Sequence, residues 1–122
     1  MATLVHGTTR YRAEQIIRYG PDPRYMEPGG LPVNDGFSMY VDGGPYMYKP
    51  PEEYAKGKDL QCPNEGGPVI LVVENVPDDV LDAANRLGIL PLSFGVVQFD
   101  YGDGLEELLA VWPFLPKVIR DV

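Results

Sequence analysis

The chain has 122 residues, of which 44% are apolar and 23% charged, and its formal net charge is −8. This length and composition suit one ordinary core, so we expect a single domain over residues 1–122 rather than a disordered chain. The negative charge repels phosphate, which argues against general nucleic-acid binding and against anionic membranes. The longest apolar run, residues 68–73, is too short to cross a bilayer, and no signal-peptide pattern opens the chain, so we expect a cytoplasmic protein.

A strand, a turn and a helix are predicted at the N-terminus. Residues 2–6 form a short apolar strand, and a threonine in the His-Gly-Thr-Thr run that follows is placed to cap a helix. Apolar residues between 13 and 17 have helical spacing, and Gly20 followed by a proline ends that helix. The Pro/Gly-rich residues 20–35 then predict a long loop, and loops of that length in compact domains are usually functional.

Strands and helices alternate in the middle of the chain. Residues 37–41 (FSMYV) alternate between two faces, which predicts a half-buried strand with Tyr40 pointing away from the core. Pro51 followed by two glutamates opens a helix. The β-branched run 68–74 predicts a strand that is covered on both faces, and we expect it to lie in the middle of the sheet.

Two helices and one strand are predicted in the last third. The first helix opens at residues 77–79 and ends at Gly88, and residues 96–99 form a strand. Asp103 and Glu106 have the spacing of a capping box at the start of a final helix, which a proline interrupts. The order of elements indicates an α+β domain.

His6 is the only histidine and Cys62 the only cysteine, so a His-rich or Cys-rich metal site is not expected. His6 lies in the run 4–9 (LVHGTT), which ends a strand and precedes a helix. This run resembles the opening motif of ADP-ribosyltransferases of the His-Tyr-Glu type. The resemblance implies that His6 binds the adenosine ribose of NAD, that the backbone of Gly7 binds the nicotinamide amide, and that Thr8 belongs to the same binding segment. A glycine suits that role because it lets the backbone approach the ring closely and offer a donor and an acceptor.

A second part of the resemblance lies in residues 36–40 (GFSMY) and 53–55 (EYA). They are similar to the strand and helix that hold nicotinamide in that family, and a flat electron-poor ring stacks well on tyrosine. Strict register puts Ser38 where the family has its tyrosine, and Tyr46 offers a competing register. The resemblance implies a binding site that includes Phe37, Ser38, Tyr40 and Tyr54. The alternative is that the eight tyrosines are scattered over loops and sheet edges without such a role.

The third motif of the family is a glutamate at the head of a late strand, which stabilises the cationic ribose in the transition state. Glu106 and Glu107 are the only late pair of glutamates, and the resemblance gives this role to Glu106. Their position also fits first-turn helix acids, and the strand 96–99 has no glutamate at its head. The carboxylate therefore comes from Glu106 or from Glu107, or it is absent.

The resemblance implies a split mixed sheet with peripheral helices and an NAD-dependent mono-ADP-ribosyltransferase. NAD is then a substrate, and the acceptor is a protein, a nucleic acid or a small molecule. A second hypothesis is a non-catalytic domain on the same scaffold that binds a nucleotide or a protein, since fold does not fix function. A third is an unrelated small α+β protein in which His6 is structural.

RNA phosphotransferases that act with NAD share the same opening motif. They rely on additional arginines and histidines to hold a phosphate, and this chain supplies only the arginines. Arg10, Arg12 and Arg18 lie close together in the sequence, which is compatible with a local basic patch. An RNA phosphotransferase is therefore a weaker hypothesis than an ADP-ribosyltransferase.

Overall fold

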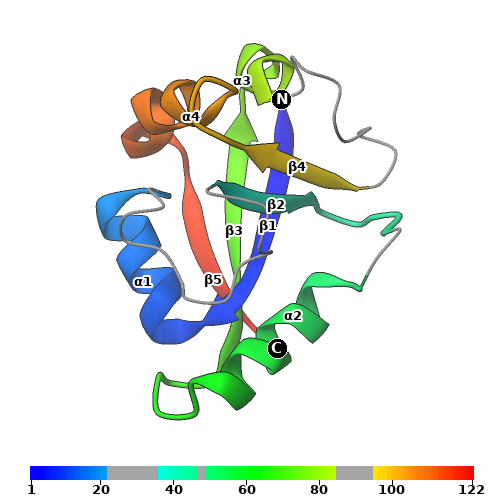
Figure 1. Ribbon diagram of the computed structural model, residues 1–122, viewed down its shortest axis with the longest axis vertical. Coiled ribbons are helices and arrows are strands. Elements are labelled where there is room, and N and C mark those ends of the chain that lie inside the picture. The colour runs from blue at the N-terminus through cyan, green and yellow to red at the C-terminus, as the bar shows by residue number, and fades with distance from the viewer. Residues whose placement is uncertain (22–35, 47–48, 85–94) are drawn as a thin grey trace.

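The computed structural model describes residues 1–21, 36–46, 49–84 and 95–122. Its centre is a five-stranded sheet in the order β4-β2-β1-β3-β5 (Figure 1). The strands are β1 (Ala2–Thr9), β2 (Phe37–Val41), β3 (Pro68–Val76), β4 (Val96–Phe99) and β5 (Lys117–Asp121). All four neighbouring pairs are antiparallel.

The α+β class is confirmed, but the prediction of a mixed sheet is wrong. β2 and β3 run in the same direction because both are antiparallel to β1. They do not pair with each other, because β1 lies between them. Every ladder in the described sheet is therefore antiparallel.

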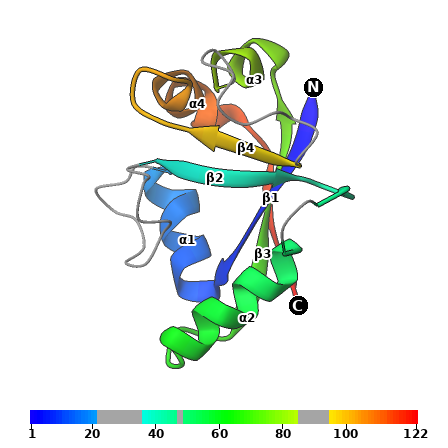
Figure 2. The same cartoon turned by 45° about the vertical axis from the view of Figure 1, so that its right-hand side comes forward.

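Helices cover both faces of the sheet. They are α1 (Arg10–Tyr19), α2 (Pro51–Gln61), α3 (Asp78–Ala84) and α4 (Leu105–Val111), with a 3-10 turn η3 (Trp112–Phe114). α1, α3 and α4 pack on one face and α2 packs on the other (Figure 2). Among the helices that the structure describes, none is long and apolar enough to span a membrane.

The two faces carry separate apolar cores. The larger core includes Leu4, Phe37 and Leu71 and is covered by α1, α3 and α4. The smaller core lies under α2 and consists of Val5, Tyr40, Ala55, Ile70, Val72 and Val96. β3 contributes to both, so the prediction that this strand is covered on both faces is confirmed. The expectation that Tyr40 points away from the core is wrong, because α2 buries that face and leaves Tyr40 only 9% exposed.

β5 is an edge strand that the sequence pattern did not predict. Lys117, its first residue, donates hydrogen bonds to the carbonyl oxygens of Trp112 and Leu115, and its ammonium lies 4.9 Å from the centroid of the Trp112 ring. Desolvation by burial lowers the pKa of Lys117 from its usual value. These contacts attach the start of β5 to the turn η3.

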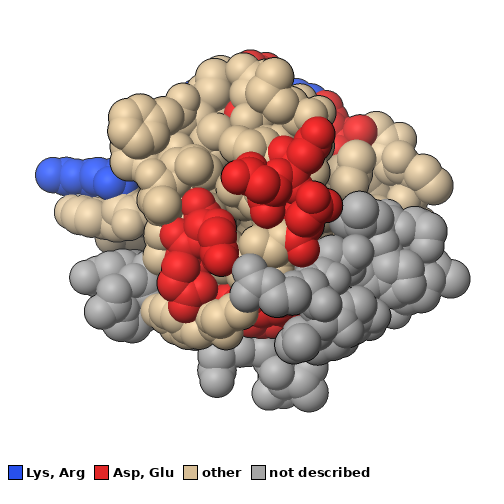
Figure 3. Space-filling view, turned by 90° about the horizontal axis from the view of Figure 1, so that it is seen from above, with Lys and Arg blue, Asp and Glu red and all other residues tan. Residues whose placement is uncertain are grey.

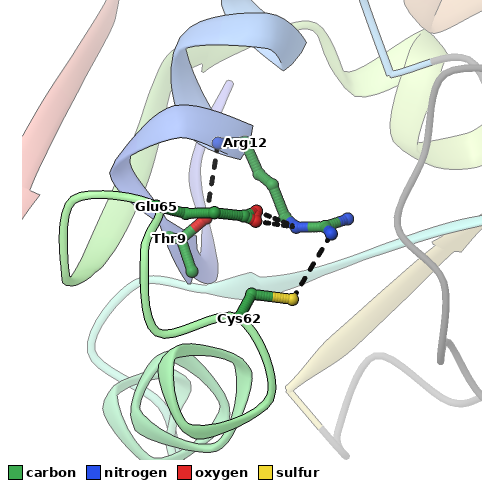
Figure 4. Close-up of polar contacts among 4 residues, drawn as sticks. All are labelled: Thr9, Arg12, Cys62 and Glu65. Carbon is green, nitrogen blue, oxygen red and sulfur yellow. Dashed lines mark hydrogen bonds and ion pairs between the residues drawn. The ribbon is translucent and has the colours of Figure 1, made fainter.

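The start of α1 is tied to the segment that follows α2 (Figure 4). Thr9 caps α1 as predicted, and its hydroxyl accepts a hydrogen bond from the backbone of Arg12 at 3.4 Å. The guanidinium of Arg12 donates to both carboxylate oxygens of Glu65, at 2.8 and 3.0 Å, and to the sulfur of Cys62 at 3.4 Å. Arg10 pairs with Asp121. Acidic side chains thus pair with Arg10 and Arg12, two of the three arginines considered for a basic patch.

Gly7 lets α2 pack directly on β1. A Cβ atom at this position would lie 2.0 Å from the carbonyl oxygen of Pro51 and 2.9 Å from the amide nitrogen of Ala55. Both are backbone atoms of α2, so no side-chain rotation relieves the overlap. The glycine is therefore required by packing, whatever else it does.

We predict that Gly7→Ala lowers the free energy of unfolding by about 1–3 kcal/mol, the range for an overpacked core, because α2 must shift. Gly57→Ala is the matched control, since it lies in the same helix and no described atom lies within 4 Å of its added Cβ. It should raise stability by about 0.5–1 kcal/mol through helix propensity. Equilibrium urea unfolding measures both, and a Gly7→Ala protein as stable as the wild type would contradict the packing argument.

Candidate functional site

β1 and β2 separate soon after they pair. The ladder between them consists of Leu4↔Val41 and Val5↔Tyr40, whereas the ladder between β1 and β3 continues to the end of β1. In Figure 1, β2 and β4 run across the direction of the other three strands. We name the place where the two strands part, between residues 6–9 of β1 and 37–39 of β2, the fork.

The backbone of Gly7 is directed into the fork. In an antiparallel ladder, alternate residues direct both their N–H and C=O groups to the same neighbouring strand. The amide of Arg10 donates a hydrogen bond to the carbonyl of Gly67 at 3.0 Å. The backbone groups of Arg10, Thr8 and His6 therefore point toward β3. The backbone groups of Thr9 and Gly7 point the opposite way, toward β2. Thr3 shows the same direction, because its carbonyl oxygen accepts a hydrogen bond at 3.0 Å from the amide of Asp42, the residue after β2. Gly7 therefore presents one donor and one acceptor toward β2.

Ser38 faces Gly7 from the other side of the fork. The amide of Val41 donates to Gly95 at 2.8 Å, so Val41, Met39 and Phe37 direct their backbones to β4. By the same alternation Ser38 directs its N–H and C=O toward β1. The register Val5↔Tyr40, continued by two residues, sets Ser38 level with Gly7. The fork is thus lined by backbone donors and acceptors from both strands.

His6 bridges the fork with its side chain. Its Nδ1 donates a hydrogen bond to the carbonyl oxygen of Ser38 at 2.8 Å, which requires the proton on Nδ1. The ring packs on Phe37 with a centroid distance of 4.6 Å, and Nε2 is buried. His6 therefore links the two strands just beyond the point where their ladder stops.

Three tyrosines gather on the α2 side of the fork. The rings of Tyr40 and Tyr54 stack at a centroid distance of 5.4 Å and an interplanar angle of 27°, and Tyr46 meets Tyr40 edge-on at 5.9 Å. A ligand ring held between two others needs their centroids about 7 Å apart, twice the carbon–carbon contact distance of about 3.5 Å. Tyr54 is 38% exposed and lies on the outer layer, so it is the ring that can move aside.

A chain of polar side chains lies on the same face. The hydroxyl of Ser38 donates to Oε1 of Gln98, and Nε2 of Gln98 donates to Oδ1 of Asp100 at 2.9 Å. Ser38 pairs with Gln98 in the ladder, two residues from the pair Tyr40↔Val96, so all of them share the α2 face. Sequence reasoning missed Gln98 and Asp100. The signal was the alternation that puts them on the same face as Val96.

The other residues that the resemblance implicates lie elsewhere. By alternation the side chains of His6, Thr8 and Phe37 are all on the face opposite Tyr40, and Thr8 and Phe37 are fully buried. Glu106 accepts hydrogen bonds from the amide of Gly102, at 2.9 and 3.0 Å, at the start of α4. In Figure 1, α4 is at the opposite end of the molecule from α2, which carries Tyr54.

The predicted capping box between Asp103 and Glu106 is wrong, because Glu106 accepts from the amide of Gly102 and not from that of an N-cap residue. The N-cap of α4 is Gly104 in a left-handed conformation, without a side-chain cap, and Asp103 is buried before it. Glu106 and Glu107 are first-turn acids of a helix, as their spacing indicated. Figure 3 shows acidic side chains gathered over the end that carries α3 and α4. That end repels anionic ligands.

No protein-family model matches the chain, and neither a curated protein nor a solved structure matches it. The resemblance to ADP-ribosyltransferases therefore rests on the sequence motifs in residues 4–9, 36–40 and 53–55. Within the described ranges, no group of three or more His, Cys, Asp or Glu side chains is arranged to hold a metal ion. The groups available to a ligand at the fork are backbone amides, aromatic rings and the polar chain.

We predict that His6→Ala lowers the free energy of unfolding by about 1–3 kcal/mol, because it removes one hydrogen bond and leaves a cavity beside Phe37. His6→Asn should recover part of this loss, since the asparagine amide can donate from nearly the position of Nδ1. Urea unfolding of both variants measures the difference. If both are destabilised equally, the bond to Ser38 does not hold the fork.

Proposed function

We propose that the chain binds NAD at the fork, with its nicotinamide carboxamide on the backbone of Gly7, and transfers ADP-ribose from it to an acceptor. The observation that carries the proposal is the pair of backbone groups that Gly7 directs at the fork. A primary carboxamide has one acceptor oxygen and two donor hydrogens, so it complements an N–H and a C=O on one residue.

The tyrosines offer aromatic faces on which the nicotinamide ring can stack. Nicotinamide is flat and electron-poor, and an aromatic face on the same side of the fork favours stacking. The direct contact between Tyr40 and Tyr54 leaves no room for a third ring, so we expect Tyr54 to swing outward when nicotinamide binds. Tyr40 is buried and stays in place as the inner wall.

The reaction breaks the bond between the ring nitrogen of nicotinamide and C1′ of the ribose. A nucleophile of the acceptor then forms a bond to C1′, nicotinamide leaves, and the acceptor loses a proton. The transition state carries positive charge on the ribose, so the rate depends on a carboxylate placed next to it. The acceptor is a protein, a nucleic acid or a small molecule.

The second candidate function is NAD or nucleotide binding without turnover. The observation that favours it is the hydrogen bond that Glu106, the acid to which the resemblance gives the catalytic role, accepts from the amide of Gly102 at the start of α4. Release of free nicotinamide from NAD, measured over time by chromatography, separates the two candidates. Release supports transfer or hydrolysis, and saturable binding without release supports the non-catalytic domain.

We predict that Tyr54→Ala weakens NAD binding about threefold to tenfold, which corresponds to the loss of one aromatic stacking contact. The matched control is Tyr11→Ala on α1, which removes a 55% exposed tyrosine on the other side of the sheet and should leave the affinity unchanged. Isothermal titration calorimetry measures both affinities. The proposal fails if the wild type does not bind NAD at millimolar concentration, or if the two variants behave alike.

A further inference from the structure

β5 lies at one edge of the sheet, next to β3 (Figure 1). The amide of Glu74 donates to the carbonyl of Pro116 at 2.9 Å, so by alternation the even-numbered residues of β5 direct their backbone groups to β3. The odd-numbered residues, Lys117, Ile119 and Asp121, direct theirs outward. Among the residues that the structure describes, none hydrogen-bonds to these outward groups. The edge therefore offers a row of backbone donors and acceptors to a further strand.

The side chains of β5 do not shield this edge. Natural sheets often protect an edge strand with a lysine whose charge stays on the edge. Here the ammonium of Lys117 is folded back onto η3, where it donates to the carbonyl oxygens of Trp112 and Leu115. Val118, on the α2 face of the strand, is 53% exposed. An accessible backbone edge thus lies beside an exposed apolar side chain.

The charges of β5 are complementary to those of a second β5 that runs antiparallel to it. The strand begins with Lys117 and ends with Asp121. When two copies pair about Ile119, Lys117 of each lies opposite Asp121 of the other. Val118 of each then lies opposite Arg120. Because the odd-numbered residues direct their backbone groups outward, each of their opposite pairs exchanges two backbone hydrogen bonds. Every residue of the strand is thus paired, and opposite charges face each other.

The neighbouring antiparallel registers are less favourable. A pairing centred on Arg120 sets the guanidinium groups of the two copies opposite each other, and like charges directly opposite are destabilising. A pairing centred on Val118 sets Asp121 opposite Leu115, which precedes the strand, so the charge pairs are lost. The register centred on Ile119 is the one that uses the whole strand and keeps both charge pairs.

The two faces of the paired strands gain different contacts. On the α1 face, Asp121 already pairs with Arg10 of its own chain, and the pairing adds Lys117 of the second copy on its other side. On the α2 face, the exposed Val118 packs against the aliphatic part of the Arg120 side chain opposite it. The pairing therefore covers an apolar side chain and places each Asp121 between two cations.

We propose that two copies of the chain associate through antiparallel pairing of their β5 strands, in the register centred on Ile119, to form one continuous sheet. The proposal is independent of NAD binding, because β3 and β1 separate β5 from β2 on the other side of the fork. The contact is a single strand from each copy, so the dimer belongs to the weak class of protein interfaces.

Sedimentation velocity of the full chain, from about 10 μM to about 1 mM, measures the association. The mass should rise with concentration from 13.5 kDa toward twice that value. Asp121→Lys should raise the dissociation constant about fivefold or more, because it turns both charge pairs with Lys117 into repulsive ones. Asp82→Lys, at an exposed acid on α3, is the matched control. It removes the same negative charge from a chain of net charge −8, so it should not weaken the dimer.

Amide hydrogen exchange of the wild type, followed by NMR, locates the contact without any substitution. The amides of Ile119 and Asp121 point outward, so they should become protected only at concentrations where the dimer forms. The amides of Val118 and Arg120 point toward β3 and should exchange slowly at every concentration. This alternation along one strand distinguishes edge pairing from a dimer formed through another surface.

A chain whose mass stays at 13.5 kDa over the whole concentration range overturns the proposal. A dimer in which the amides of Ile119 and Asp121 exchange as fast as in dilute protein overturns it too, because the contact then lies elsewhere. Equal weakening by Asp121→Lys and Asp82→Lys contradicts the register. Selective weakening by Asp121→Lys, together with protection of the two outward amides, supports it.

Discussion

The short ladder between β1 and β2 is the constraint on which the rest of the site depends. Two residue pairs form the ladder between the strands. Beyond them, the side chain of His6 donates a hydrogen bond to the carbonyl of Ser38 and holds the strands together. The backbones of Gly7 and Ser38 face each other across the fork, and the carbonyl oxygen of Ser38 accepts its hydrogen bond from His6. A ligand with one donor and one acceptor complements the N–H and C=O groups that Gly7 directs at the fork.

The packing of α2 decides what else surrounds the fork. Because Gly7 has no side chain, the first turn of α2 lies directly on β1, and this brings Tyr54 onto Tyr40. On the same face, the polar chain of Ser38, Gln98 and Asp100 lies toward the start of β2 and the end of β4. One close contact between a helix and a strand thus separates an aromatic side from an anionic side.

The local sequence pattern predicted the positions of the helices and strands better than it predicted which of them pack or pair together. Periodicity located the strands around Val5, Tyr40 and Ile70, and it identified Glu106 as a helix acid. It missed β5, because this short edge strand is rich in charged residues. Alternation placed Tyr40 on the face opposite Phe37 but gave no information on whether a helix covers that face. Gln98 and Asp100 joined the site only through the pairing of β2 with β4, about sixty residues away, and no local signal sets that register.

The central claim is that the backbone at the fork receives a carboxamide, and amide chemical shifts measured by NMR during titration with nicotinamide test it most directly. Nicotinic acid is the control, because its carboxylate has no hydrogen to donate to the carbonyl of Gly7. The account predicts saturable shifts of the Gly7 and Ser38 amides with nicotinamide and much weaker ones with nicotinic acid. Shifts confined to α3 and α4, or equal responses to the two compounds, would contradict it.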